Sequence, residues 1–487
     1  MKYLATFIKN NNFYNFCFTE LLSVCEMYGI KNVDYNRDTF SYNINLEPYV
    51  EISFEGIEDP SICQKLIDRA TLLKSIIKIY GKGDTMDQVL MDIEKNNNEE
   101  MKKEQESLET FRVDIDFRGR SENRKVQLEI MNKLDKFPMK GKVDLDNTER
   151  IFVIFRNTIE NQKSKEIIST KYYFGRQISA KDDKKFRFYS KYDLIHRKYI
   201  GPTSTDHLLS FLMTNFAQVK EGQMVVDPFV GTGSLLIPSS IYKAICFGCD
   251  LDVRVLRGYS VGYTRKSEED KTPEKMKGDI FSNFDDYNLE RPQIIRQDIN
   301  KSAFKKNNFL FDAIICDPPY GWRAPVRKTG LPSNKKEKRE KRLEKKRKKK
   351  GNEEKEDEKE LNNINEEGDK EDNNNNIDKD NNVVNIENED MDYNYCDTNG
   401  QKRMFLPTSH CSVNTIFEGL IDFAVNNLKV GGFLVCLFPV KKEKEEEELV
   451  DHPINFPRPP QFKLISACEN INSKLRSRWC LVYKKIS

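Results

Sequence analysis

The residues DPPYG at 317–321 place a carboxylate, two prolines and an aromatic ring directly after the apolar run 311–316. That run has the length and composition of a buried strand in a parallel sheet. Ligands of open α/β sheets bind at the carboxyl ends of the strands. We therefore predict that the motif lies at such an edge and holds a planar amino group while another group is transferred to it.

The exocyclic amine of a nucleobase is a weak nucleophile, because its lone pair is delocalised into the ring. Acceptors aimed at its two N–H bonds favour the pyramidal nitrogen that attacks a methyl group. We expect Asp317 to accept one N–H and the carbonyl of Pro318 the other, while Pro319 fixes the turn and Tyr320 stacks on the base. The alternative is a structural Pro-Pro turn, which would need neither the acid nor the aromatic ring.

A second motif, VVDPFVGTGS at 225–234, predicts a strand that ends in an acid, a glycine turn and the start of a helix. Glycines allow close approach of a ligand to the backbone, and a helix start offers unpaired N–H groups. The G-x-G spacing is shorter than the dinucleotide fingerprint, and an acid would repel a pyrophosphate. Cationic S-adenosylmethionine suits the acid better, so we predict cofactor contacts from Asp227, Phe229, Gly231 and Gly233. An ordinary βα turn is the alternative.

Two further acids follow short apolar runs. Asp250 ends the sequence FGCD and is placed to accept the ribose hydroxyls of a nucleoside. Asp252 is better explained as a helix N-cap. Asp298 follows the run 294–297 and is expected to accept the adenine amine, although a surface acid in a loop would give the same pattern.

Alternating strands and helices are expected to position these motifs. The C-terminal half, apart from a charged insertion, is typical of an α/β fold with a doubly wound, mostly parallel sheet. The predicted strands are 224–226, 245–249, 311–316, 432–439, 463–468 and 479–484, and the predicted helices are 234–244, 253–263 and 413–428.

The N-terminal half has a different pattern, which predicts small α+β modules and hence two lobes joined near residues 160–205. The predicted strands are 2–8, 39–44, 50–54, 111–117 and 150–155, and the predicted helices are 16–28, 61–80 and 126–134. The charged stretch 94–106 is expected to be a surface linker or a helix.

The composition limits the compartment and the ligands. The chain has 487 residues, a formal net charge of +2, 11 cysteines and 4 histidines. The near-neutral charge confines any nucleic-acid contact to a patch, and the scattered cysteines favour a reducing, cytoplasmic location over secretion. We expect no metal site, because the histidines lack ligand spacing and Cys246 and Cys249 form a lone C-x-x-C. No apolar run is long enough to span a bilayer.

Residues 333–400 are expected to form a disordered, low-complexity insertion. Residues 335–350 are nearly all charged and mostly basic, and residues 351–392 are acidic and rich in asparagine. Such a composition cannot bury enough apolar surface to offset the loss of chain entropy. A solvated loop is the favoured interpretation, and a basic arm that contacts RNA phosphates or a nuclear-localisation signal is the alternative.

Together these motifs resemble those of class I S-adenosylmethionine-dependent amino-methyltransferases. A closer resemblance is to the eukaryotic and archaeal tRNA guanine-N2 methyltransferases that modify position 10. The segments that carry it are YFGR at 173–176, HRKYIGPTS at 196–204, DPFVGTGSLL at 227–236, DPPYGWRA at 317–324, and the N-terminal stretches 2–8, 68–81 and 141–157.

The resemblance implies a Rossmann-like methyltransferase domain at 206–487, preceded by a ferredoxin-like and THUMP-containing RNA-binding region at 1–165 and a linker at 166–205. It implies S-adenosyl-L-methionine as the cofactor and methyl transfer to the exocyclic amine of guanosine 10 in tRNA. A small zinc-binding activator subunit is implied as a partner. By motif matching, the catalytic residues are Asp317, Pro318, Pro319 and Tyr320, and the cofactor residues include Asp227, Gly231, Gly233, Asp250 and Asp298.

Basic and aromatic residues interleave in the N-terminal half, where lysine and arginine can pair with phosphates and aromatic rings can stack on bases. The candidates for tRNA contact are Arg118, Arg120, Arg124, Lys125, Lys163, Lys165, Lys171, Tyr172, Tyr173 and Arg176. An ordinary charged surface is the alternative. For the whole chain, the rival functions are an adenine-N6 or protein-glutamine methyltransferase and a non-catalytic RNA-binding protein.

Overall fold

The computed structural model divides into two compact units. One comprises Met1–Gln297, Ser302–Pro318 and Leu420–Ser487, and the other comprises Asp298–Lys301 and Pro319–Gly419. The strand expected at 39–44 and nearly all of the expected insertion lie outside the described residues. The structure describes every residue except 1, 9, 11, 36–48, 97–98, 162–163, 165, 183–186, 259–262, 265–277, 322–325, 331–394, 397–401, 404–407, 442–455 and 474–475.

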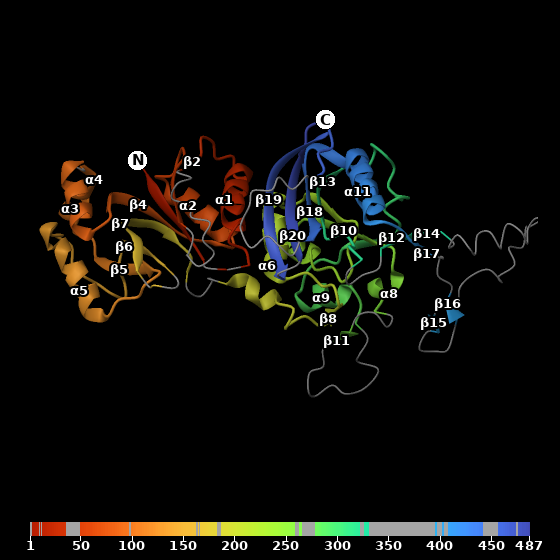
Figure 1. Cartoon of the computed structure of the whole chain (residues 1–487), viewed down its shortest axis with the longest axis horizontal. Coiled ribbons are helices and arrows are strands. Elements are labelled where there is room, and N and C mark those ends of the chain that lie inside the picture. The colour runs from red at the N-terminus through yellow and green to blue at the C-terminus, as the bar shows by residue number, and fades with distance from the viewer. Residues whose placement is uncertain are drawn as a thin grey trace, which may run out of the picture. The chain divides into compact units, whose positions relative to one another are not determined.

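A seven-stranded sheet forms the N-terminal half of the first unit (Figure 1). Neighbouring strands are antiparallel except β5 and β6, which run parallel. In spatial order the strands are β2 (Asp34–Tyr35), β3 (Tyr49–Ser53), β1 (Tyr3–Phe7), β4 (Leu73–Gly83), β7 (Ile167–Ala180), β6 (Arg150–Glu160) and β5 (Phe111–Arg118). Strand β7 comes from the stretch expected as a linker, and it pairs with both β4 and β6.

Three helices of this half are capped at the N-terminus by a side chain. Helix α2 begins where the Asp59 carboxylate accepts the Ser61 N–H at 2.8 Å and Pro60 takes the first helical position. Val89 of α3 is buried in one cluster with Phe152 of the sheet. The helices are α1 (Phe16–Met27), α2 (Pro60–Arg69), α3 (Met86–Lys95), α4 (Glu99–Glu106) and α5 (Arg124–Asn132).

The helix predicted over 61–80 is wrong in its second half. Helix α2 ends at Arg69, and the following residues form the long strand β4. The segment is rich in isoleucine, whose β-branched side chain fits a pleated sheet better than a helix. The adjacent Ile76 and Ile77 are both buried, so both faces of the sheet are covered at this strand.

The second sheet confirms the prediction of a doubly wound, mostly parallel α/β fold. Its first five strands run parallel, and β20 is antiparallel to both of its neighbours. In spatial order the strands are β12 (Gln293–Arg296), β10 (Ile245–Asp250), β9 (Met224–Asp227), β13 (Phe311–Cys316), β18 (Leu428–Lys441), β20 (Arg476–Lys485) and β19 (Phe462–Ser473).

Helices follow these strands as expected, but two are shorter than predicted. The helix expected at 234–244 covers only Leu236–Ile241, and the one expected at 253–263 ends at Leu256. Within the described ranges, no helix is long and apolar enough to cross a bilayer. The helices of this half are α6 (His207–Phe216), α7 (Leu236–Ile241), α8 (Val253–Leu256), α9 (Phe281–Asp286) and α11 (Val413–Asn427).

Register brings the ends of three strands to one edge. Strand β9 lies between β10 and β13, with Asp227 opposite Gly248 and Val226 opposite Ile314. Because the strands are parallel, the residues that follow them emerge on the same side. The acids Asp227, Asp250 and Asp317 therefore belong to one edge of the sheet.

The second unit is built from short antiparallel pairs among its described residues. Strand β14 (Arg327–Thr329) pairs with β17 (Thr408–His410), and β15 (Tyr395–Cys396) pairs with β16 (Lys402–Arg403). The Cys411 N–H donates to the Val326 carbonyl at 3.1 Å and extends the first pair.

A buried polar network connects helices from the two halves of the first unit. Glu20 of α1 accepts bonds from the Thr71 N–H at 2.7 Å and from the Asn215 amide of α6 at 2.7 Å. The Asn215 carbonyl oxygen accepts the Arg69 Nε–H at 2.8 Å, and Arg69 also donates to the Val219 carbonyl at 2.8 Å. Glu20 and Asn215 are both fully buried, so their polar groups form hydrogen bonds within this network and not with water.

We expect Glu20→Gln to lower the free energy of unfolding by about 2–3 kcal/mol, because an amide N–H₂ would then face backbone N–H donors in a buried place. Thermal unfolding of the full chain measures the effect. Glu26→Gln on the same helix is the matched control, since the Glu26 side chain is 50% exposed and its surface ion pair contributes at most about 1 kcal/mol. Equal losses from the two variants would contradict a structural role for the network.

Candidate active site

The loop after β9 is organised by Asp227. Its Oδ1 accepts the Phe229 N–H at 2.9 Å, which turns the chain back toward the sheet edge. Burial, together with repulsion from the Asp250 and Asp317 carboxylates, raises the pKa of Asp227 well above its ordinary value, although the Phe229 bond opposes the shift. A positive ligand beside this group would favour its ionised form.

The two predicted glycines have different roles. Gly231 and Gly233 both adopt left-handed backbone conformations, with φ of +50° and +84°. A Cβ on Gly233 would lie 3.0 Å from Phe284 and 3.2 Å from Ile280. A Cβ on Gly231 would meet nothing closer than the Phe229 carbonyl oxygen at 4.0 Å. Gly233 therefore serves packing, whereas Gly231 leaves open space beside the backbone for a ligand.

Asp250 is tied directly to the glycine loop. Its Oδ2 accepts the Gly231 N–H at 2.9 Å, and its Oδ1 accepts the Asp252 N–H at 2.8 Å. Burial raises the pKa of Asp250 to about 6. Asp252 caps α8 by accepting the Arg254 N–H at 3.0 Å, which confirms the N-cap interpretation. The strand end of β10 thus supplies one site acid and one structural acid.

Asp317 directly follows β13 and has a cationic partner. The Arg478 Nη1–H donates to its Oδ2 at 2.9 Å, and the Thr205 hydroxyl lies 3.4 Å from the same oxygen. Pro318 is buried and ends this part of the first unit. Neither Arg478 nor Thr205 was predicted, because both lie more than 100 positions from Asp317 in the sequence and no spacing pattern links them to it.

The other three predicted site residues belong to the second unit. Pro319 and Tyr320 begin it and are half-buried. Asp298 Oδ2 accepts the Thr329 N–H at 2.7 Å, and its Oδ1 accepts the Asn300 N–H at 2.9 Å. Burial opposes ionisation, but these hydrogen bonds outweigh it and lower the pKa of Asp298. Asp298 is therefore charged, and both of its carboxylate oxygens already accept hydrogen bonds from backbone N–H groups.

The segment before α6 braces the glycine loop. The Arg197 side chain is buried and donates from Nη1 to the Ser234 hydroxyl at 2.5 Å. The hydroxyls of Ser204 and Thr232 share a bond of 2.7 Å, and the Gly201 N–H donates to Ser204 at 2.8 Å. These supporting contacts were not predicted, because Arg197 and Ser204 lie about 30 positions from their partners in the glycine loop.

Two of the predicted tRNA contacts are instead structural. Arg118 is buried and pairs with Asp116 at 2.6 Å. The Tyr173 ring is buried, and its hydroxyl donates to Glu51 at 3.1 Å. The prediction is wrong for both, because their polar groups are held inside the N-terminal sheet rather than offered to phosphates or bases.

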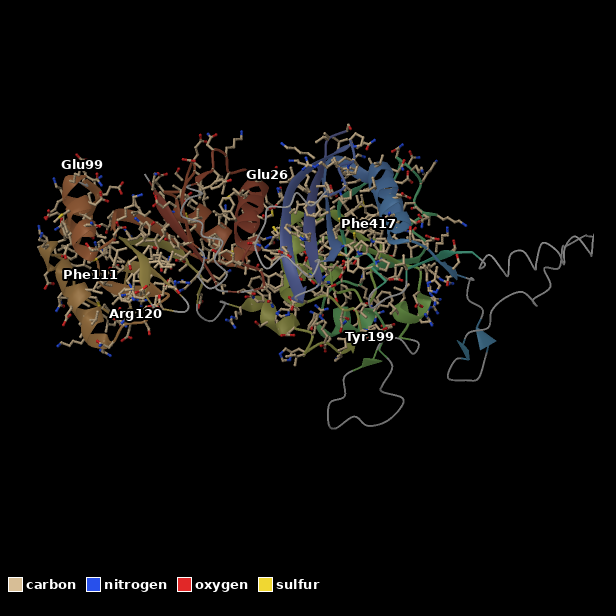
Figure 2. The ribbon with its side chains drawn as sticks, in the orientation of Figure 1. Glu26, Glu99, Phe111, Arg120, Tyr199 and Phe417 are labelled. Carbon is tan, nitrogen blue, oxygen red and sulfur yellow. The ribbon has the colours of Figure 1, made fainter. Side chains whose placement is uncertain are left out.

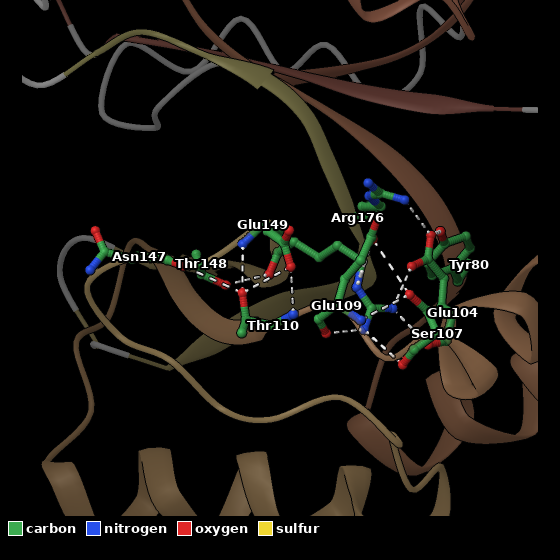
Figure 3. Close-up of polar contacts among 10 residues, drawn as sticks. Tyr80, Glu104, Ser107, Glu109, Thr110, Asn147, Thr148, Glu149 and Arg176 are labelled. Atoms are coloured by element: carbon green, nitrogen blue, oxygen red, sulfur yellow. Dashed lines mark hydrogen bonds and ion pairs between the residues drawn. The ribbon is translucent and has the colours of Figure 1, made fainter.

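Arg176 also belongs to an internal network (Figure 3). Glu104 accepts bonds from the Tyr80 hydroxyl at 2.8 Å, from Arg150 Nη1 at 3.1 Å and from Arg176 Nη1 at 2.9 Å. Burial alone would raise the pKa of Glu104, but these hydrogen bonds outweigh the effect of burial, and the pKa is lowered. The network attaches α4 to strands β6 and β7, so the main role of Arg176 is to hold the sheet and helix together.

The remaining basic candidates are exposed or unassigned. Arg120 (Figure 2), Arg124 and Lys125 are exposed around the start of α5. Lys171 is exposed and paired with Asp84. Lys163 and Lys165 lie outside the described residues.

Alanine substitutions at two glycines separate backbone strain from packing. Gly233→Ala and Gly222→Ala both force a side chain into a left-handed conformation, which costs about 1–2 kcal/mol. Only Gly233→Ala adds a close contact, since a Cβ on Gly222 would meet nothing within 4 Å. We expect a clearly lower thermal midpoint for Gly233→Ala than for Gly222→Ala. Equal midpoints would contradict the packing role.

Known proteins resemble this chain in sequence along most of its length. Residues 1–182 match the family model of the Tmrp11 THUMP N-terminal domain. The tRNA (guanine(10)-N(2))-methyltransferase TRMT11 of Dictyostelium discoideum is 31% identical over 353 residues, which is 69% of this chain and 65% of that protein. Thus the chain spans slightly less than two thirds of that relative.

The TRMT11 proteins of Xenopus laevis and Homo sapiens are each 28% identical, over 88% and 90% of this chain and 75% and 81% of their own lengths. Among solved structures, TrmN from Thermus thermophilus covers 100% of both chains with 12% identity and a TM-score of 0.37. The fold assignment rests on the strand order. The matches in sequence extend over most of the chain, which is therefore similar along both of its halves to the tRNA (guanine(10)-N(2))-methyltransferases named TRMT11.

Proposed function

We propose that this chain is the catalytic subunit of a tRNA (guanine-N2)-methyltransferase, which transfers a methyl group from S-adenosylmethionine to the exocyclic amine of guanosine 10. One observation carries the proposal beyond similarity in sequence. The glycine loop, Asp250 and Asp317 follow three adjacent parallel strands and lie at one edge of the sheet. A nucleoside cofactor and an amine acceptor both need polar groups at such an edge.

The residues of the edge fit S-adenosylmethionine. The open side of Gly231 allows a ligand to approach the backbone, and Asp250 is placed to accept ribose hydroxyls. Burial and, after it, repulsion from neighbouring acids raise the pKa of Asp227, and a cationic amino acid moiety would offset both. Asp298 and Phe229 are the remaining proposed cofactor residues. When bound, the cofactor supplies an electrophilic methyl group on a sulfonium.

Asp317 is the centre of the proposed chemistry. Its carboxylate accepts one N–H of the guanine N2, the Pro318 carbonyl accepts the other, and Tyr320 stacks on the base while Pro319 fixes the turn. The nitrogen must come within roughly 3–3.5 Å of the methyl carbon, in line with the bond that breaks. Methylation leaves a positive charge on the nitrogen, which then loses a proton, and the Asp317 carboxylate is the base held at that position.

The proposed contacts with tRNA lie in the N-terminal half. Arg120, Arg124 and Lys125 are the exposed basic residues we assign to phosphate contact. A small zinc-binding activator subunit is the second proposed partner. Among the described strands, β12 at the edge of the second sheet pairs only with β10, so its other side offers backbone groups to an added strand.

Asp317→Ala should reduce methyl transfer by about 100-fold or more, because the amine loses an acceptor used in the transition state. Binding of S-adenosylhomocysteine, measured by calorimetry, should change little. The assay uses bulk tRNA and labelled cofactor, with and without the activator, followed by mapping of the modified base. Asp422→Ala is the control, because that acid is exposed on α11. Retained turnover, or methyl groups mapped to adenine, would refute the assignment.

Cofactor affinity should depend on pH through Asp250. With a pKa of about 6 in the folded chain, this group is charged above pH 7 and becomes neutral as the pH falls below 6. A neutral carboxyl is a poorer acceptor for ribose hydroxyls, so affinity for S-adenosylhomocysteine should fall over that window. Asp250→Asn should bind weakly at all pH values and lose most of the dependence. An unchanged pH profile in the variant would exclude Asp250 as the titrating group.

A further inference from the structure

Arg478 contacts the proposed catalytic acid from β20, which is separated from β13 by β18 in the same sheet. It lies on β20, opposite Pro439 of β18 and Asn470 of β19. Its Nη1 is 2.9 Å from Asp317 Oδ2, and the two side chains are 18% and 15% exposed. The pair is therefore largely screened from water, where an ion pair has a stronger orienting effect than at the surface.

The other donors of Arg478 are poorly used. Nη2 has only a long contact of 3.4 Å to Asn470 Oδ1, and Nε is buried without a partner among the described residues. A guanidinium normally satisfies its five N–H groups when it is buried. The short bond to Asp317 is thus the principal polar contact of this side chain, which links the position of Arg478 to that carboxylate.

The strand pairing around Arg478 does not require this ion pair. Backbone pairing of β18 with β20 runs without a break from Phe433 opposite Lys484 to Lys441 opposite Arg476. Strand β19 pairs along the other side of β20. An apolar residue at position 478 would leave both ladders intact, so a purely structural role explains the contact poorly.

The charges that face Asp317 come from several elements. Asp227 at the end of β9 is repelled by Asp317 and by Asp250. The thiols that interact with Asp317 are Cys316 of β13, Cys436 of β18 and Cys480 of β20, and burial raises the pKa of each. The neighbouring acids disfavour a charged carboxylate at Asp317, whereas the guanidinium of Arg478 favours it.

We infer that Arg478 is a positioning residue for methyl transfer, which fixes the rotation of the Asp317 carboxylate and maintains it as a charged acceptor for the substrate amine. The contacts from Arg478 Nη1 and from the Thr205 hydroxyl both fall on Oδ2, which favours one orientation of the carboxylate. The inference rests on the proposed function, since it requires Asp317 to act on an amine.

The test compares Arg478→Met and Arg478→Lys in the full chain with the activator subunit added, using bulk tRNA in single-turnover assays from pH 6 to pH 9. Arg478→Met should lower the rate of methyl transfer about 100-fold near pH 7, as expected for a misplaced catalytic group. The defect should fall on the rate of the chemical step and not on the affinity for tRNA, because Arg478 contacts the Asp317 carboxylate. With Arg478→Lys the rate should be about tenfold higher than with Arg478→Met, since lysine restores the positive charge but not the planar guanidinium.

Controls separate this role from folding and from the proposed function. Binding of S-adenosylhomocysteine and the thermal midpoint should stay close to those of the unmodified chain, and Lys484→Met on the same strand should leave the rate unchanged. In an Asp317→Asn background, Arg478→Met should have little further effect. A rate defect that is not recovered by lysine, or that persists in full in the Asp317→Asn background, would overturn the inference. An active Asp317→Ala variant would instead overturn the proposed function.

Discussion

The parallel register of β9, β10 and β13 is the constraint on which the candidate site depends. Each strand is short, yet each ends in an acid at the same sheet edge. A shift of one residue would turn each of these acids to the other face of the sheet. The buried residues of the strands prevent such a shift, since Val225, Val226, Ile314 and Ile315 are inaccessible to solvent. Apolar packing therefore determines where the polar chemistry occurs.

The site concentrates negative charge, and the fold offsets only part of it. Hydrogen bonds from the Phe229 and Gly231 N–H groups stabilise the carboxylates of Asp227 and Asp250, and a guanidinium stabilises Asp317. The pKa values of Asp227 and Asp250 nevertheless remain raised. Burial and charge repulsion of this kind are offset by a cationic ligand, so the packing of the acids favours the binding of a cation over that of an anion.

The sequence predicted the parts of the site that are local. An acid after an apolar run and a glycine turn before a helix are patterns within ten residues, and the structure has both where they were expected. The sequence could not predict Arg478 at Asp317, Arg197 behind the glycine loop, or the burial of Arg118 and Tyr173, because tertiary packing decides these. The misassigned β4 has the same origin, since Leu73–Gly83 forms a strand only through its sheet neighbours.

The network of Glu20, Arg69 and Asn215 limits how this protein could evolve. Two of its members come from the N-terminal half and one from α6, and Arg69 also lies over the Tyr242 ring at 3.3 Å. A gene fusion that attached either half to a foreign protein would leave a buried acid, a cation or an amide without its hydrogen-bonding partner. The two halves must therefore be inherited together or change in concert at these positions, and they are less interchangeable than separate domains on a flexible linker.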